Sequence, residues 1–136
     1  MISADVRAAI AAHARAEDPN ESCGLLLLRD GVAERYEPGR NISASPYRFE
    51  LEVDPELWFA EDDGYELAVV HSHLSAPAYP SRTDVENVGL WTSRPYLIYS
   101  LREDDLAAFT IGEDGAIARL SLHARCTSSR GSDPVN

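Results

Sequence analysis

ELAVVHSHLSAPAYPSRTD, residues 66–84, joins a short apolar run to two histidines, a proline-containing loop and an aspartate. His71 and His73 are two residues apart, and Asp84 follows the second histidine by eleven residues. Side chains two apart on a strand point to the same face, so both imidazoles can reach one ion. Two imidazoles and one carboxylate make three protein ligands, the number typical of a catalytic zinc site.

The same stretch indicates an α/β fold. Residues 66–70 are too few for a helix and fit a buried strand, residues 74–80 form a loop, and a helix runs from Ser81 to about Leu90. The other expected elements are a helix over 3–16, strands over 23–28, 32–37, 48–53 and 96–101, a short helix from Pro55 to about Asp62, and a hairpin of 109–111 and 117–122. We therefore predict a single α/β domain over 1–123, with a mixed sheet flanked by helices, and a mobile polar tail over 124–136.

The composition excludes several classes of function. The chain has 136 residues and a formal net charge of −11, with twelve arginines and no lysine, which argues against a nucleic-acid partner. No stretch approaches the ~20 apolar residues of a membrane span, and no signal segment is recognisable, so we expect a cytoplasmic protein without membrane contact. Cys23 and Cys126 are too few for a disulfide framework, and we expect Cys23 as a buried, reduced thiol.

Residues 81–84 have two interpretations. A serine followed three residues later by an acid is typical of a helix capping box, in which each side chain satisfies a backbone N–H group. The Ser81 hydroxyl can cap a helix and also face a metal. For Asp84 the two roles compete, because one carboxylate cannot easily bind zinc and reach back to the cap. The ligand types suit zinc, while iron and manganese stay open.

A zinc hydrolase also needs a group that takes the proton from the attacking water. Glu21 is the candidate, because it comes just before the buried strand at 23–28. On local grounds alone, a solvated acid that ends a loop explains Glu21 better.

The remaining histidines and the aromatic residues favour structural roles. His13 falls on the first helix and His123 near the end of the domain, and neither has partners at ligand spacing. Trp58, Tyr79 and Trp91 are expected in the core or in the wall of a cleft.

Together, these residues match the JAMM signature of the MPN-plus metalloproteases. That signature is a distant Glu, then His-Ser/Thr-His, seven residues, Ser, two residues and Asp. It is filled here by Glu21, His71-Ser72-His73, Ser81 and Asp84. The flanking residues 19–26, 41–43 with Phe49, and 78–81 also resemble the family, over about residues 1–122.

The resemblance implies a cytidine-deaminase-like α/β/α sandwich, and it is greatest to small stand-alone bacterial members of the family. It implies that His71, His73 and Asp84 bind zinc, that Glu21 is general base and acid, and that Ser81 stabilises the oxyanion. It also implies hydrolysis of a peptide or isopeptide bond next to the C-terminal Gly-Gly of an ubiquitin-like sulfur-carrier protein, with cysteine as one candidate leaving group.

Three other functions compete with this interpretation. A non-catalytic MPN scaffold usually lacks the histidines and the aspartate that this chain has. A phage-tail or cell-wall peptidase is often fused to a second peptidase domain, which is absent here. A zinc deaminase needs H-x-E and P-C-x-x-C, and the chain has neither. The carrier, the leaving group and the formation of a homodimer are left open by the sequence.

Overall fold

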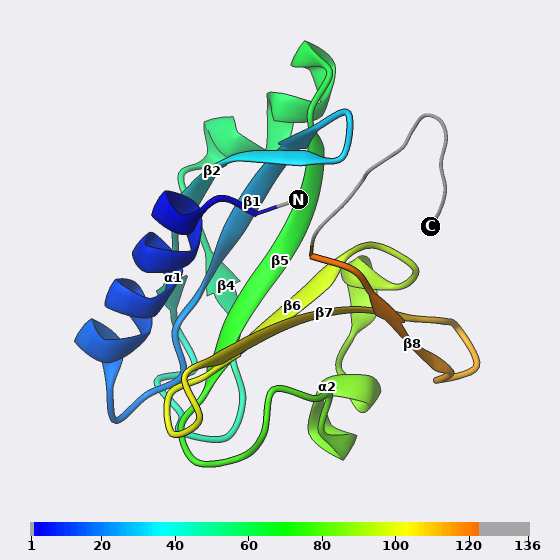
Figure 1. Ribbon diagram of the computed structural model, residues 1–136. Helices are drawn as coiled ribbons and strands as arrows, with labels where there is room; N and C mark the ends of the chain where they lie inside the picture. The colour runs from blue at the N-terminus through cyan, green and yellow to red at the C-terminus, as the bar shows by residue number, and fades with distance from the viewer. Residues whose placement is uncertain (1, 123–136) are drawn as a thin grey trace.

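A six-stranded mixed sheet runs through the protein in the computed structural model, which describes residues 2–122 (Figure 1). The strands lie in the order β2-β1-β5-β6-β7-β8, and β3 and β4 form a separate pair. Their bounds are β1 Cys23–Arg29, β2 Val32–Pro38, β3 Arg40–Asn41, β4 Leu51–Glu52, β5 Glu66–His73, β6 Tyr96–Ser100, β7 Asp105–Ile111 and β8 Ile117–Leu120. Neighbouring strands of the large sheet are antiparallel except β5 and β6, which pair in parallel.

Helix α1 (Ala4–Glu17) covers one face of this sheet (Figure 1). The helix begins after Ser3, whose hydroxyl accepts a hydrogen bond from the backbone N–H of Val6 at 3.2 Å, as expected for an N-cap. Its buried side chains recur at helical spacing and share one apolar cluster with residues of β1, β2, β5, β6 and β7: Val6, Ile10, Ala11 and Ala14.

The opposite face is covered by short elements: the 3₁₀-helices η1 (Pro55–Asp63) and η2 (Gly89–Trp91), and helix α2 (Arg82–Glu86). The helix expected from Pro55 is thus present, but it is a 3₁₀-helix. A second apolar cluster lies beneath these elements, and Ala60 and Trp91 are its buried members from η1 and η2. Secondary structure on both faces of a mixed sheet confirms the predicted α/β class.

The strand predicted over 48–53 is mostly wrong. Only Leu51–Glu52 form a strand, and they pair with Arg40–Asn41 instead of joining the large sheet. The Asn41 side chain accepts from the N–H of Glu50 and donates to the carbonyl of Arg48, so a side chain replaces the bonds of a ladder here. The alternating apolar side chains of this segment still pack on the second apolar cluster, as their period indicates: Phe49, Leu51 and Val53.

The helix predicted over 81–90 is too long. Helix α2 ends at Glu86, and both the backbone and the side-chain amide of Asn87 donate to the carbonyl of Thr83. Gly89 then adopts φ +50°, a left-handed conformation that interrupts an α-helix.

Two strands are longer than predicted because they pair with a buried neighbour. Strand β5 continues through His73, since residues Val69 to His73 pair with Tyr96 to Ser100 of β6. The histidines therefore belong to a central strand and not to the loop that follows it. Strand β7 begins at Asp105 instead of residue 109, because its first residues also pair with β6.

The peripheral predictions have mixed outcomes. Cys23 is buried and free, and burial together with the charges of Glu21 and Glu17 raises the pKa of its thiol to about 12. Tyr79 is 50% exposed, with its ring edge-on to Phe109, and is therefore not a core residue. The predictions for His123, Cys126 and the tail over 124–136 lie outside the described residues. Within residues 2–122, none of the helices has the length and apolar character needed to cross a bilayer.

Gly24 tests the packing of β1 between β2 and β5. A Cβ atom at this position would lie 2.5 Å from the Tyr36 hydroxyl and 2.6 Å from the Glu37 carbonyl oxygen. We expect Gly24→Ala to lower the free energy of unfolding by about 1–3 kcal/mol, measured by urea denaturation. Gly112→Ala is the control, because its Cβ would meet the end of the flexible Asp114 side chain at 3.0 Å and the Ala116 carbonyl oxygen at an ordinary contact distance of 3.8 Å. Equal stability of the two variants would contradict this account of β1.

Candidate metal centre

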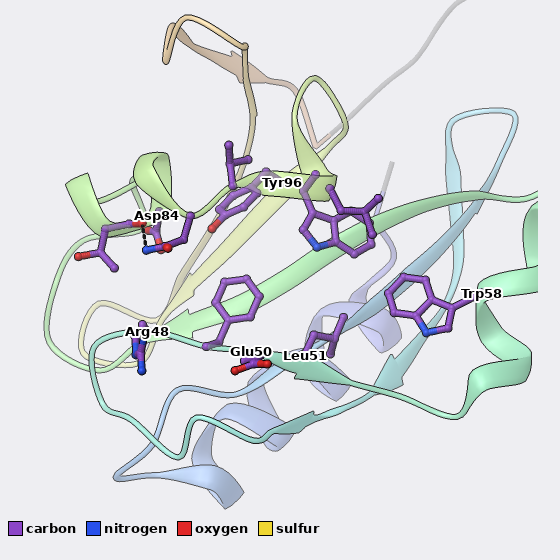
Figure 2. Close-up of a pocket in the computed structure, with 13 residues that line it drawn as sticks. Arg48, Glu50, Leu51, Trp58, Asp84 and Tyr96 are labelled. Carbon is purple, nitrogen blue, oxygen red and sulfur yellow. Dashed lines mark hydrogen bonds between the residues drawn. The ribbon is translucent and has the colours of Figure 1, made fainter.

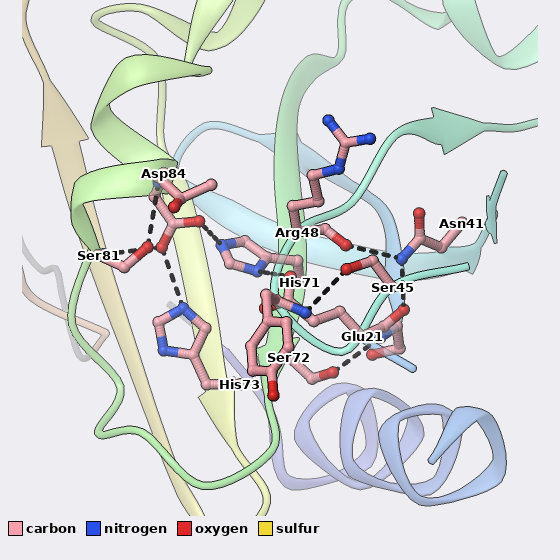
Figure 3. Close-up of polar contacts among 12 residues, drawn as sticks. Glu21, Asn41, Ser45, Arg48, His71, Ser72, His73, Ser81 and Asp84 are labelled. Atoms are coloured by element: carbon pink, nitrogen blue, oxygen red, sulfur yellow. Dashed lines mark hydrogen bonds and ion pairs between the residues drawn. The ribbon is translucent and has the colours of Figure 1, made fainter. Parts of the chain in front are cut away.

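Three separate parts of the chain meet where β5 ends (Figure 3). Glu21 lies just before β1, His71 and His73 lie in β5, and Asp84 lies in the first turn of α2. All four side chains are buried, with residue exposures of 2, 0, 4 and 3%. Buried acids and imidazoles are rare without partners, so the contacts among these groups decide what the site can do.

His71 lies between the two acids. Its Nδ1 is 3.2 Å from Oε1 of Glu21, and its Nε2 is 3.4 Å from Oδ1 of Asp84. An ionised carboxylate only accepts hydrogen bonds, so in the neutral imidazole Nδ1–H donates to Glu21 and Nε2 carries a lone pair. This Nε2 is buried and has no hydrogen-bond partner. The His71 ring is held by Phe49, stacked at 4.4 Å between centroids and 22° between planes.

His73, like His71, directs its Nε2 toward Asp84. Its Nδ1–H donates to the carbonyl oxygen of Pro77 at 2.8 Å, which leaves the Nε2 of the neutral ring as an acceptor. Nε2 lies 3.0 Å from Oδ2 of Asp84, which is also an acceptor. Two acceptors at this distance need a cation between them, either a proton on the imidazole or a metal ion.

The electrostatics of the pair agree with this geometry. Burial disfavours the charged imidazole, but the hydrogen bonds to Asp84 and to Pro77 outweigh it and raise the pKa of His73. Burial likewise opposes ionisation of Asp84, but the attraction of His71, the contact with His73 and the N–H of Ser81 hold its pKa at about 2. Asp84 is therefore an anion at neutral pH and attracts a cation to the two Nε2 atoms.

Asp84 caps α2 and contacts the two histidines at the same time, so the expected competition between the cap and zinc ligation does not extend to these contacts. The Ser81 hydroxyl accepts from the N–H of Asp84 at 3.1 Å, and Oδ2 of Asp84 accepts from the N–H of Ser81 at 2.9 Å. The capping box is complete while the same carboxylate contacts both imidazoles. A carboxylate has two oxygens with several acceptor sites, so it serves the helix end and the centre together.

Glu21 is not the solvated acid that its local sequence favoured. One potential ligand atom from each of Glu21, His71 and His73 lies within 4.8 Å of the others. These three residues are thus close enough to hold an ion, while Asp84 lies 3.4 Å from Nε2 of His71 and 3.0 Å from Nε2 of His73. The orphaned Nε2 of His71 and the opposed acceptors of His73 and Asp84 favour a metal on the Asp84 side, so the residues present fit the predicted zinc.

Tyr96 is the residue of the centre that sequence reasoning missed. It is 1% exposed, its ring is edge-on to His71 at 5.3 Å between centroids, and it lines the same cavity as Asp84 (Figure 2). Burial and the charges of Asp84 and Glu21 raise the pKa of Tyr96 far above its ordinary value, so the hydroxyl stays protonated. Its position in a predicted strand carries no sequence signal for this role.

Residues of the centre line two cavities. The first, of about 300 Å³, includes Asp84 and Tyr96 in its lining and has Phe49, Trp58 and Trp91 among its walls (Figure 2). The prediction that Trp58 and Trp91 lie in the core or in the wall of a cleft is therefore confirmed.

The second cavity, of about 320 Å³, is lined by Glu21, His73 and Ser81, with Pro46 and Tyr47 at its side. Glu21 thus lines a different cavity from Asp84. The two carboxylates can therefore act on different parts of one bound ligand.

Comparison with known proteins gives one family for most of the chain. A model described as prokaryotic homologs of the JAB domain matches residues 3–112. The CysO-cysteine peptidase of Mycobacterium tuberculosis is 37% identical over 126 residues, which cover 86% of this chain and 85% of that protein. The tail tip assembly protein K of Escherichia phage N15 is 42% identical over 99 residues, which cover 72% of this chain and 40% of that protein.

Solved structures agree on the fold. A protein of Desulfitobacterium hafniense, known from a solution structure, has a TM-score of 0.72 and 35% identity, over 88% of each chain. A JAB1/MPN domain protein of Archaeoglobus fulgidus has a TM-score of 0.55 and 21% identity, over 88% of this chain and 94% of that one. The second likeness shows the fold alone, which is the fold expected from the sequence.

Removing one imidazole tests the proposed metal centre. We expect His73→Ala to weaken zinc binding by more than the about 10- to 100-fold that loss of an outer partner typically costs, because a ligand is lost outright. Isothermal titration calorimetry and metal analysis measure this. His13→Ala is the control, since His13 lies on α1 and contacts Tyr36 instead. Full zinc occupancy in His73→Ala would refute the assigned ligand.

The pKa of Asp84 predicts an acid-linked loss of stability in the metal-free protein. A folded pKa of about 2, below the ordinary 3.8, means that ionised Asp84 stabilises the fold above about pH 4 and that this contribution disappears as the pH falls to 2. The contribution is about 2 kcal/mol. Urea unfolding between pH 5 and 2 should show a shallower pH dependence for Asp84→Asn than for the wild type. Parallel curves would contradict the shift.

Proposed function

Because the chain belongs to the JAB/MPN family, in its prokaryotic branch, we propose that it is a zinc-dependent peptidase acting on an ubiquitin-like sulfur-carrier protein. The bond cleaved is the amide that follows the carrier's C-terminal Gly-Gly, and cysteine is the first candidate for the leaving group. The observation that carries the proposal is the buried set of two imidazole Nε2 atoms opposed to one carboxylate. The likeness to a CysO-cysteine peptidase over most of both chains supports the choice of substrate.

In this proposal His71, His73 and Asp84 hold the zinc. The ion would lower the pKa of water toward ~7 and polarise the scissile carbonyl. Phe49 fixes the plane of the His71 ring, and the Pro77 carbonyl fixes the tautomer of His73. The capping box fixes Asp84 at the start of α2, so each ligand is oriented before an ion arrives.

Glu21 moves the proton. Its Oε1 accepts from the Nδ1–H of His71, which leaves Oε2 to take a proton from the attacking water. The same carboxyl group then delivers that proton to the departing amine nitrogen. Because Glu21 lines the second cavity, the leaving amine lies on that side of the centre.

Ser81 stabilises the developing oxyanion. Its oxygen accepts the cap bond from the N–H of Asp84 through a lone pair, and its own O–H proton remains to be donated. A donor of this kind is typically worth about 3 kcal/mol of the barrier.

A second candidate is a peptidase of the phage-tail type. The 42% identity to a tail tip assembly protein favours it, although the match covers only 40% of that protein. Its substrate would be a cell-wall peptide, not a carrier protein. A non-catalytic scaffold is disfavoured, because the sequence keeps every position of the signature.

The decisive variant is Glu21→Ala. Zinc-loaded wild-type protein is incubated with a sulfur-carrier protein extended by cysteine beyond Gly-Gly, and the products are identified by mass spectrometry. We expect loss of the extension with the wild type and a rate about 10²- to 10⁴-fold lower with Glu21→Ala, because the proton acceptor is gone. The variant should still contain zinc at saturating concentration, since Glu21 is not a proposed ligand.

Glu17→Ala is the matched control, because Glu17 is an acid at the end of α1 that belongs to neither the proposed ligands nor the proposed base. Cleavage at the wild-type rate by Glu21→Ala would show that the assigned base is wrong. Cleavage of muropeptides but not of the carrier would favour the second candidate.

A further inference from the structure

Asn41, the last residue of β3, has a fully used and buried side chain. It is 8% exposed. Its Nδ2 donates to the carbonyl oxygens of Glu21 at 3.1 Å and Arg48 at 3.0 Å. Its Oδ1 accepts from the N–H groups of Ser43 at 3.1 Å and Glu50 at 2.9 Å. Two donors and two acceptors are all that an amide offers for such bonds, and here every partner is backbone.

The first of these bonds fixes the backbone of the proposed base. The carbonyl of Glu21 accepts from Asn41, and its N–H donates to the carbonyl of Ser45 at 2.9 Å (Figure 3). Both backbone groups of Glu21 are therefore bound by residues 41–45. The next residue, Ser22, is bound instead by Ser72 between the two histidines, through its N–H at 2.7 Å and its carbonyl at 3.0 Å.

The other bonds fix the segment that covers His71. Asn41 binds Arg48 and Glu50, the two neighbours of Phe49, and the Phe49 ring stacks on His71. The loop between has Ala44 at φ +48°, a left-handed conformation that costs an alanine about 1–2 kcal/mol and that needs support. One amide thus connects the acid to the ring that orients the imidazole beside it.

We propose that Asn41 is a positioning residue of the hydrolytic reaction, which sets the Glu21 carboxylate relative to His71 by binding the carbonyls of Glu21 and Arg48. This inference rests on the proposed function. The four hydrogen bonds of Asn41 reach no proposed ligand, and its side chain is buried, so it acts through the backbone of Glu21 and of the segment around Phe49. A displacement of about 1 Å in such a group typically costs about 10² in rate.

Asn41→Asp tests the donor role of the Asn41 amide separately from its acceptor role. Aspartate keeps the acceptors for Ser43 and Glu50, which hold the loop, and loses the donors for Glu21 and Arg48. Asn41→Ala loses both roles. If the donors position Glu21, both variants should lower kcat at least about 10-fold with KM changed less than about 2-fold and zinc content unchanged. Asn41→Asp also places a carboxylate oxygen against the carbonyl oxygens of Glu21 and Arg48, so both variants should lower the melting temperature.

A control variant that is destabilised away from the centre shows whether a loss of stability by itself lowers kcat. Ile10→Ala removes a buried side chain of α1 on the opposite face of the sheet, and it should lower the melting temperature while keeping kcat. If Asn41→Asp cleaves the carrier at the wild-type rate, the positioning role is refuted. A loss of kcat in Ile10→Ala as large as that in Asn41→Asp would also refute it.

Amide exchange in the metal-free protein gives a readout that does not depend on cleavage. By NMR, Asn41→Asp should exchange the Glu21 N–H at least about 10-fold faster, while the N–H of Glu50 stays protected by the retained acceptor. Unchanged exchange at Glu21 would overturn the inference even if activity fell. If the wild type cleaves no carrier but this exchange pattern is found, the proposed function fails and the positioning of Glu21 stands.

Discussion

The centre depends on two imidazole nitrogens and one carboxylate that cannot satisfy each other without a cation. Nδ1 of each histidine is occupied, by Glu21 in one case and by Pro77 in the other, so both rings turn a lone pair toward Asp84. Lone pairs held this close in a buried site are unfavourable unless a positive charge lies among them. The fold therefore keeps a cation-binding arrangement ready before any ion is present.

The sheet makes this arrangement rigid. Strand β5 is paired on both sides, with β1 through Cys23 to His71 and with β6 through His71 to Ile98, so neither imidazole sits on a movable loop. Asp84 comes from a different layer, where the capping box fixes it at the start of a five-residue helix. A cap usually serves only the helix end, but here the same carboxylate also holds α2 against the sheet. A change at Asp84 would consequently affect both the stability of the start of α2 and the geometry of the centre.

Glu21, the acid on the other side of His71, is held by hydrogen bonds to its backbone and not by strand pairing. Glu21 is outside any strand, and its backbone is bound by Asn41 and Ser45. The segment after Asn41 has no regular structure until β4, because side-chain bonds replace a ladder. This explains why alternating apolar residues predicted a strand that is absent. The alternation of apolar residues indicates which face of the segment is buried. It does not indicate that the backbone of Arg48 and Glu50 is hydrogen-bonded to the distant Asn41 side chain.

The sequence by itself determined the α/β class, the main strands and the identity of the residues that meet, because periodicity and spacing are local properties. His71 and His73 share a face for any strand at that position, and the distant Glu21 is found through its likeness to a family. Tertiary structure alone decided that Glu21 is buried, that Asp84 both caps α2 and faces the histidines, and that Tyr96, Phe49 and Asn41 complete the surroundings. These outcomes depend on contacts between residues far apart in the chain, and no local pattern encodes the distance between them.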